Sequence, residues 1–284
     1  MSSLLDFLPN LPVSQWMSQL IEWLTVNLSF IFDNLKNFGT QLMEGTTALL
    51  QYIPPLVFII LIVLIAYWVT DRRFGLAFFS GVGLMYIHNQ GLWNNMLNTL
   101  TLIIAASIIS IVIGIPLGIT MAKSSLVEKI LQPALDFMQT MPAFVYLIPA
   151  VSFFGTGMVP GVFASVIFAL PPIVRFTNLG IRQVPEDLVE AADAFGSTGW
   201  QKLVKVELPN AKSTIMAGTN QTVLLALSMV VTASMIGAPG LGTDVLTALQ
   251  RGNVGSGFVS GFALVIMAII IDRILQSVNK DTNK

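Results

Sequence analysis

The chain has 284 residues, of which 54% are hydrophobic and only 10% charged, and this balance predicts an all-α polytopic membrane protein rather than soluble domains. A formal net charge of −1 gives nucleic acid nothing to bind, so we exclude nucleic acid as a partner. The absence of cysteine excludes disulfides, zinc–thiolate sites and cysteine nucleophiles.

The N-terminal segment, residues 1–52, is amphipathic but too polar to cross a bilayer. Large apolar residues recur every three or four positions from Trp16 to Leu42, with one polar lapse at Asn27. Two interpretations stay open: a helix in the membrane interface, with aromatic rings at headgroup depth, or a helix packed on a spanning helix. The start, Met1 to Pro12, lacks the basic residues and apolar run of a cleaved signal peptide.

Seven apolar stretches predict seven transmembrane helices, because most approach the roughly 20 residues that cross about 30 Å of hydrocarbon. They run from Ile53 to Thr70, Phe74 to Tyr86, Leu97 to Ala122, Leu135 to Phe154, Val159 to Thr177, Ile215 to Ile236 and Phe258 to Ile274. The second is short unless it extends to Leu92. We therefore expect additional helices in 53–92, a transmembrane core in 93–276 and a tail in 277–284.

A polar island, residues 179–213, separates the fifth and sixth stretches and must lie outside the bilayer. Pro185 suits the start of a short helix, and Gly196 suits its end. The apolar residues between them recur at i, i+3, i+4 and i+7: Leu188, Ala191, Ala192 and Phe195. Thr198 and Gln201 have capping-box spacing and begin a second helix, which we expect Pro209 to end. From these residues alone, a bent knob and an amphipathic loop on the membrane surface are equally good interpretations.

The basic residues predict the orientation of the chain. If the island is cytoplasmic, then all of the 14 Lys and Arg residues except Lys36 and Arg251 lie inside, as the positive-inside rule requires. Seven helices then place the N-terminus outside and the C-terminus in the cytoplasm.

Few residues suggest chemistry. His88 is the only histidine, no phosphate-binding Gly-x-x-x-x-Gly-Lys motif occurs, and no chain of acids and bases lies at membrane depth. No enzyme activity, cofactor or metal is therefore expected in this chain. The polar run Asn220, Gln221 and Thr222 lies inside the sixth stretch. It either joins neighbouring helices by hydrogen bonds or contacts a polar solute.

The island carries a motif with several fixed positions. Glu190-Ala191-Ala192 is followed after three residues by Gly196, and after nine more by Val206 and Leu208-Pro209. This spacing resembles the coupling-loop signature of the permease subunits of bacterial ABC importers, with Val206 in place of the commoner Ile. Residues 138–149, 168–182 and 235–242 resemble the branch of this family that takes up glycine betaine and proline betaine.

The resemblance implies a type I ABC importer core in the plasma membrane. It implies that Glu190, Ala191, Ala192, Gly196, Leu208 and Pro209 couple the chain to an ATPase. The implied partners are two copies of that ATPase, which would bind ATP and Mg, a second copy of this permease, an external substrate-binding lipoprotein and membrane lipid. The implied solute is glycine betaine or a related quaternary ammonium osmoprotectant.

Other interpretations remain open. Phe144 and Tyr146, like the polar run 220–222, either line the passage or face lipid and neighbouring helices. The solute can instead be choline, carnitine or methionine. The protein can also be a membrane sensor or scaffold that transports nothing, or a secondary carrier.

Overall fold

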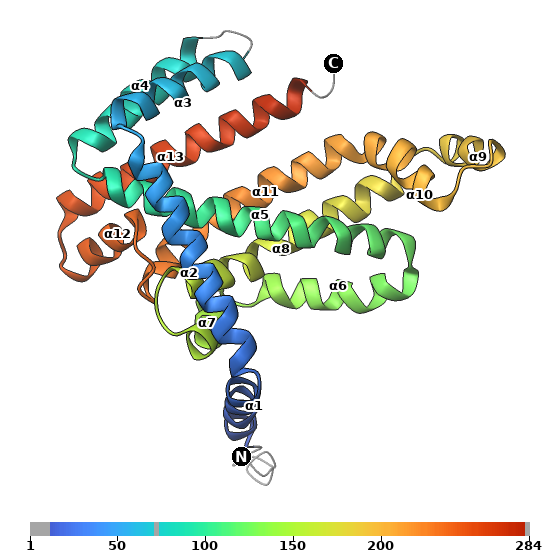
Figure 1. The fold of residues 1–284 in the computed structure, drawn as a ribbon, viewed down its shortest axis with the longest axis horizontal. Coiled ribbons are helices and arrows are strands. Elements are labelled where there is room, and N and C mark those ends of the chain that lie inside the picture. The colour runs from blue at the N-terminus through green and yellow to red at the C-terminus, as the bar shows by residue number, and fades with distance from the viewer. Residues whose placement is uncertain (1–11, 71–73, 282–284) are drawn as a thin grey trace, which may run out of the picture.

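The computed structural model describes residues 12–70 and 74–281, with side chains up to Val278, and the regular structure in these ranges is entirely helical. The predicted all-α class is therefore confirmed. The expectations for Met1 to Leu11, Arg72, Arg73 and 282–284 fall outside the described residues. Figure 1 shows an elongated molecule in which several long helices run side by side toward one projecting end.

The N-terminal segment forms two helices, α1 (Val13–Asn27) and α2 (Ser29–Tyr52), which meet at Leu28. Helix α2 crosses the long helices of the core (Figure 1) and packs on them. Met43 is buried, the hydroxyl oxygens of Thr47 and Thr101 lie 3.0 Å apart, and the Phe32 ring stacks on Phe153. Of the two interpretations of the N-terminal segment, packing on a spanning helix is therefore the correct one for α2. Helix α1 leaves Trp16, Leu20 and Trp23 exposed, as an interfacial helix would.

The core consists of α5 (Trp93–Lys123), α8 (Met158–Arg182) and α11 (Leu208–Ser234). Small residues let these helices approach closely. A Cβ atom on Gly114 would lie 2.3 Å from Ile173 Cγ2, and one on Gly218 would lie 2.6 Å from Phe176 Cβ. Glycine at these positions therefore lets the backbones of the three helices lie close together.

The remaining helices surround this core. Helices α3 (Pro55–Val69) and α4 (Phe74–Asn89) form a hairpin that packs against α13 (Val254–Asp281). The short α12 (Leu241–Gln250) follows α11, and its first backbone N–H donates to Thr99 Oγ1 on α5 at 2.8 Å.

The seven predicted spans correspond to a less regular arrangement. Within the described ranges, four helical stretches are long and apolar enough to cross a membrane by themselves: Trp93–Lys123, Met158–Arg182, Gly199–Ser234 and Val254–Val278. Two pairs of helices, bent by 94° and 107°, raise the number to six. The 16 residues of α4 rise only about 24 Å, so the count of seven is approximate.

The predicted span from Leu135 to Phe154 is wrong as a single helix. It divides into the end of α6 (Ser125–Thr140), the short 3-10 helix η2 (Ala143–Tyr146) and α7 (Leu147–Phe154). The break falls at Met141 and Pro142, because a proline disfavours helical backbone in the residue before it and Met141 is extended (ψ 136°). The other described prolines inside helices, such as Pro116 in α5 and Pro171 in α8, do not break them.

Candidate coupling site

The island between α8 and α11 folds into a knob, residues 185–202, at the end of the molecule (Figure 1). Its first helix, α9 (Glu186–Ala194), has Pro185 at the N-cap and two carboxylates in the first turn, where the helix dipole favours negative charge. Gly196 ends the helix with φ +75°, and the next amide, Ser197 N–H, donates back to Ala192 O at 3.0 Å. The predicted start and stop of this helix are confirmed.

The second helix of the knob, α10 (Gly199–Lys202), begins with the predicted capping box. Thr198 Oγ1 accepts from Gln201 N–H at 3.3 Å, while Gln201 Oε1 accepts from Thr198 N–H at 2.9 Å. Lys202 Nζ also contacts both carboxylate oxygens of Asp193 at 2.8 Å. Local hydrogen bonds and one ion pair thus hold the two short helices in a fixed bend.

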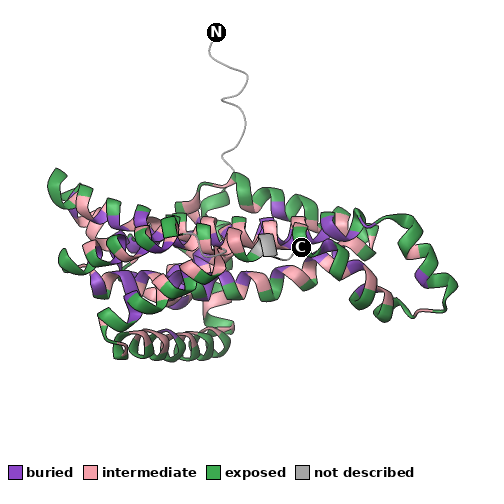
Figure 2. Ribbon diagram, turned by 90° about the horizontal axis from the view of Figure 1, so that it is seen from above, coloured by how far each residue is buried: buried purple, intermediate pink, exposed green. Residues whose placement is uncertain are grey.

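The knob presents apolar side chains to its surroundings. Phe195 is 91% exposed and Trp200 73% exposed, and Leu188 and Ala191 are also exposed. Ala192 is buried, so the predicted four-residue face of α9 is divided between the interior and the surface. Figure 2 shows exposed residues covering this end of the molecule. Large apolar residues gathered outside the membrane core mark a surface that binds a partner.

The six predicted coupling residues all lie in or directly after the knob. Glu190, Ala191 and Gly196 are exposed on it, and Ala192 supports it from inside. Leu208 is half-buried and Pro209 exposed, at the start of α11.

The prediction that Pro209 ends a helix is wrong. The chain passes from α10 through a π-helical turn, η3 (Leu203–Glu207), directly into α11. Pro209 is the second residue of α11 and lacks an N–H donor, yet Gly199–Ser234 forms one continuous helical stretch across it. In the wider turn, Leu208 N–H donates to Leu203 O. The π-turn therefore carries the helix past the proline.

Ion pairs that the sequence did not reveal fasten the helix ends near the knob. Lys123, at the end of α5, pairs with Glu207 in the π-turn. Arg182, at the end of α8, contacts Glu128 on α6 at 2.7 Å and donates to Met121 O at 3.2 Å. The only signal in the sequence is that lysine and arginine follow the apolar stretches. Their acidic partners are distant in the chain.

The five residues predicted to line the passage differ in their burial and in their contacts. Tyr146 is buried and its hydroxyl donates to Met138 O at 2.7 Å, which bridges the break between α6 and α7. Thr222 is buried and donates to Ala169 O of α8 at 3.0 Å, and Asn220 donates to Asp272 at 3.2 Å. Phe144 and Gln221 are exposed. Three of the five therefore join neighbouring helices in the structure.

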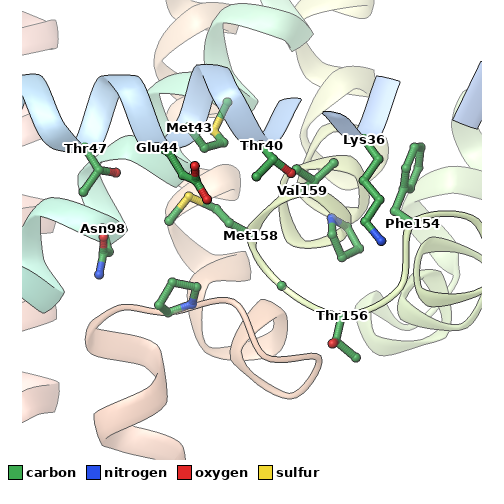
Figure 3. Close-up of a pocket in the computed structure, with 13 residues that line it drawn as sticks. Lys36, Thr40, Met43, Glu44, Thr47, Asn98, Phe154, Thr156, Met158 and Val159 are labelled. Carbon is green, nitrogen blue, oxygen red and sulfur yellow. The ribbon is translucent and has the colours of Figure 1, made fainter. Parts of the chain in front are cut away.

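A hollow of about 310 Å³, lined by both polar and apolar residues, lies between α2 and the core, a feature that the sequence did not predict (Figure 3). It lies toward the start of α5, away from the knob. Lys36, Thr40 and Glu44 extend into it from α2, opposite Asn98 of α5 and Thr156 before α8. It offers hydrogen-bonding groups of both charges, and its polar residues come from segments too far apart in the chain to be connected by spacing.

A second hollow, of about 490 Å³, lies beside α12 and the first residues of α13, and Asp244 and Arg251 line it. Helix α12 is too short to span the membrane. Burial raises the pKa of the Asp244 carboxyl, and the hydrogen bond that Asn95 Nδ2 donates to it at 2.6 Å partly offsets that rise. Among the described residues, no group of three or more His, Asp or Glu side chains is placed to hold a metal ion.

Residues 114–284 match the family described as the binding-protein-dependent transport system inner membrane component. The glycine betaine/carnitine transport permease protein GbuB of Listeria monocytogenes is 57% identical over 96% of this chain and 97% of its own length. The glycine betaine transport system permease protein OpuAB of Bacillus subtilis is 47% identical over 96% of each chain. ProW of Escherichia coli, a glycine betaine/proline betaine transport system permease protein, is 46% identical over 96% of this chain and 76% of its own.

A solved structure supports the fold. An inward-facing form of the MetNI methionine ABC transporter matches with a TM-score of 0.62 at 20% identity, over 71% of this chain and 98% of the other. The family match and the three relatives confirm the resemblance seen in the coupling motif: the chain belongs to the binding-protein-dependent inner membrane components, the multi-pass permease subunits of ABC importers.

Proposed function

We propose that this chain is the permease subunit of an ATP-driven importer of glycine betaine or a related quaternary ammonium osmoprotectant. Three relatives that match nearly the whole chain carry glycine betaine in their names. Carnitine is the second candidate solute, because the relative at 57% identity is a glycine betaine/carnitine permease.

The partners follow from the knob and from the family. Two ATPase subunits, with ATP and Mg, each receive one knob. A second copy of this permease completes the pathway, and an external binding lipoprotein delivers the solute. The observation that carries this assignment is the exposure of Phe195 and Trp200 on a knob fixed by its own caps. Large apolar side chains exposed on a structured surface outside the membrane are typical of a site that binds a partner.

This assignment orients the chain. The knob faces the cytoplasm, the N-terminus lies outside, and the C-terminus lies in the cytoplasm, in agreement with the distribution of basic residues. Helices α1 and α2 then form an external amphipathic segment, residues 1–52, and α3 and α4 add the helices of 53–92 to the core of 93–276. The last residues, 277–284, form the cytoplasmic tail.

The structure suggests how ATP drives transport. Closure of the two ATPases moves both knobs, and each knob continues through rigid helices into α8 and α11. Because glycines let α5, α8 and α11 pack closely, the motion of the knob is passed to this group of helices and opens the pathway to the other side.

The direct test is reconstitution of the permease, ATPase and binding protein in liposomes, with uptake of radiolabelled glycine betaine measured against internal ATP. We expect accumulation that requires ATP and that unlabelled glycine betaine and carnitine suppress. Glu190→Ala and Gly196→Leu are expected to keep the protein in the membrane but to lower uptake per ATP hydrolysed. Uptake that ionophores abolish and ATP leaves unchanged would indicate a secondary carrier. Absence of accumulation would leave a sensor or scaffold.

A further inference from the structure

Glu207 differs from every other charged residue whose side chain the structure describes. It is the only one that is buried, with 4% of its surface exposed. It lies in the π-turn that joins the knob to α11, and both α9 and α10 contact this turn. Its position in the coupling motif is the unspecified one between Val206 and Leu208, so the motif gives it no role.

The partner of Glu207 belongs to a different helix. Lys123 is in the last turn of α5, 40% of its side chain is exposed, and it reaches the Glu207 carboxylate directly. Nearby, Leu203 and Leu208 belong to the same apolar cluster as Ile119 and Ala122 of α5. The ion pair joins the π-turn at the root of the knob directly to the end of α5, where Met121 O also accepts from Arg182 of α8.

The other end of α5 is also fastened. Thr99 Oγ1 accepts from Leu241 N–H at 2.8 Å, and Asn95 donates to Asp244 at 2.6 Å, so both residues hold α12. Between Asn95 and Lys123, α5 is an uninterrupted helix that rises about 42 Å. It thus connects the knob with α12 through contacts at its two ends.

We propose that the Lys123–Glu207 ion pair transmits movement of the knob to α5, and through α5 to α12 on the far side of the membrane. Both are positioning residues: neither touches solute or nucleotide. The inference rests on the proposed function, because that function requires the ATPase to be coupled to the transport pathway. The inference names the contacts through which this coupling passes. The π-turn suits the role, since such turns interrupt the regular helix and occur frequently at functional sites.

The test is a set of charge variants in the reconstituted complex with ATPase and binding protein. Glu207→Gln and Lys123→Gln each remove the pair with little change in shape, and the double variant K123E/E207K restores it with reversed charge. We expect each single variant to lower uptake per ATP by about fivefold or more, the lower end of coupling between two sites. The double variant should recover most of that loss. Asp136→Asn is the matched control, because it removes the exposed Arg175–Asp136 pair between α6 and α8.

A second readout follows the far end of α5. The chain has no cysteine, so Leu249→Cys, at a 76% exposed position of α12, gives a single site for an environment-sensitive fluorophore. In the background of this variant alone, ATP should change the fluorescence. With Glu207→Gln added, the change should be lost while the ATPase still co-purifies.

The outcomes separate the two proposals. If the unmodified complex shows no ATP-dependent uptake and the Leu249→Cys complex shows no fluorescence change, the proposed function fails and the transmission contact fails with it. If the unmodified complex transports and Glu207→Gln keeps its uptake per ATP and its signal, only the transmission contact is wrong. It is also wrong if K123E/E207K recovers nothing, or if Glu207→Gln acts only by releasing the ATPase.

Discussion

Gly196 and Gly199 show how much backbone conformation alone decides in the knob. A Cβ atom would meet nothing within 4 Å at either position, but Gly196 has φ +75° and Gly199 begins an ordinary helix. A residue other than glycine in the left-handed region costs about 1–2 kcal/mol. The two glycines therefore form a matched pair that differs in backbone strain and not in packing.

We predict that Gly196→Ala loosens the end of α9 and that Gly199→Ala does not. Hydrogen exchange of the amides in α9 measures this directly, with a roughly tenfold faster exchange expected for the strained variant, as 1–2 kcal/mol requires. Uptake per ATP should fall in the same variant. Equal exchange in both variants would show that the turn at Gly196 tolerates a side chain.

Asp244 gives a prediction about pH. Its pKa is raised from 3.8 by burial, so the folded protein favours the protonated carboxyl. Stability from this group is complete below pH 3.8 and is lost as pH rises through the higher folded pKa. Asp244→Asn should therefore unfold at a higher temperature than the unmodified protein near neutral pH, and the difference should vanish at acid pH. Thermal unfolding in detergent measures it, with the exposed Asp33→Asn as control. A difference that grows on acidification would contradict the sign.

At the scale of helices, close contact between α5 and α8 depends on glycines that face a neighbour. A Cβ atom on Gly118 would lie 2.5 Å from Thr177 Cβ and 2.6 Å from the backbone oxygen of Val174. Backbone cannot move aside, so Gly118→Ala should destabilise the folded protein by about 1–3 kcal/mol. Gly261→Ala in α13, where nothing lies within 4 Å, is the control. Thermal unfolding of both variants tests the contact, and equal midpoints would show that the two helices can separate without loss.

The same scale shows which features the sequence could predict. The caps of the knob were predicted because Gly196, Thr198 and Gln201 act on neighbours within a few residues. The π-turn after α10 could not be predicted from the sequence. Proline usually ends a helix, but here Leu203 and Glu207 pack against residues of α5, which are distant in the chain.

Features that depend on contacts between distant parts of the chain were left undecided by the sequence or were not predicted from it. The sequence left two interpretations for α2, and only its contacts with α5, α7 and α8 decide between them. The hollow between α2 and the core (Figure 3) is lined by side chains from segments more than fifty residues apart in the chain, such as Lys36 and Asn98. No periodicity or motif in the sequence predicts that these distant residues lie close together.

At the scale of the whole molecule, the knob lies at the far end of α8 and α11 (Figure 1), and it exposes the large apolar side chains of Phe195 and Trp200. Elsewhere, exposed apolar residues such as Trp68 and Phe78 lie on helices that lipid surrounds in a membrane protein. With the knob in the cytoplasm, as proposed above, we expect a protein to cover Phe195 and Trp200.

We predict that Phe195→Asp and Trp200→Asp each weaken binding of the ATPase by about thirtyfold or more, since buried aromatic anchors typically contribute at least ~2 kcal/mol to an interface. Co-purification and titration of the ATPase onto the permease in nanodiscs measure the loss. Leu249→Asp, an equally exposed apolar residue on α12, should leave ATPase binding unchanged. Because neither aromatic residue packs inside the protein, both variants should keep the unfolding temperature of the unmodified permease. Binding that survives both substitutions would mean that the ATPase contacts another surface, and the knob would then need a different partner.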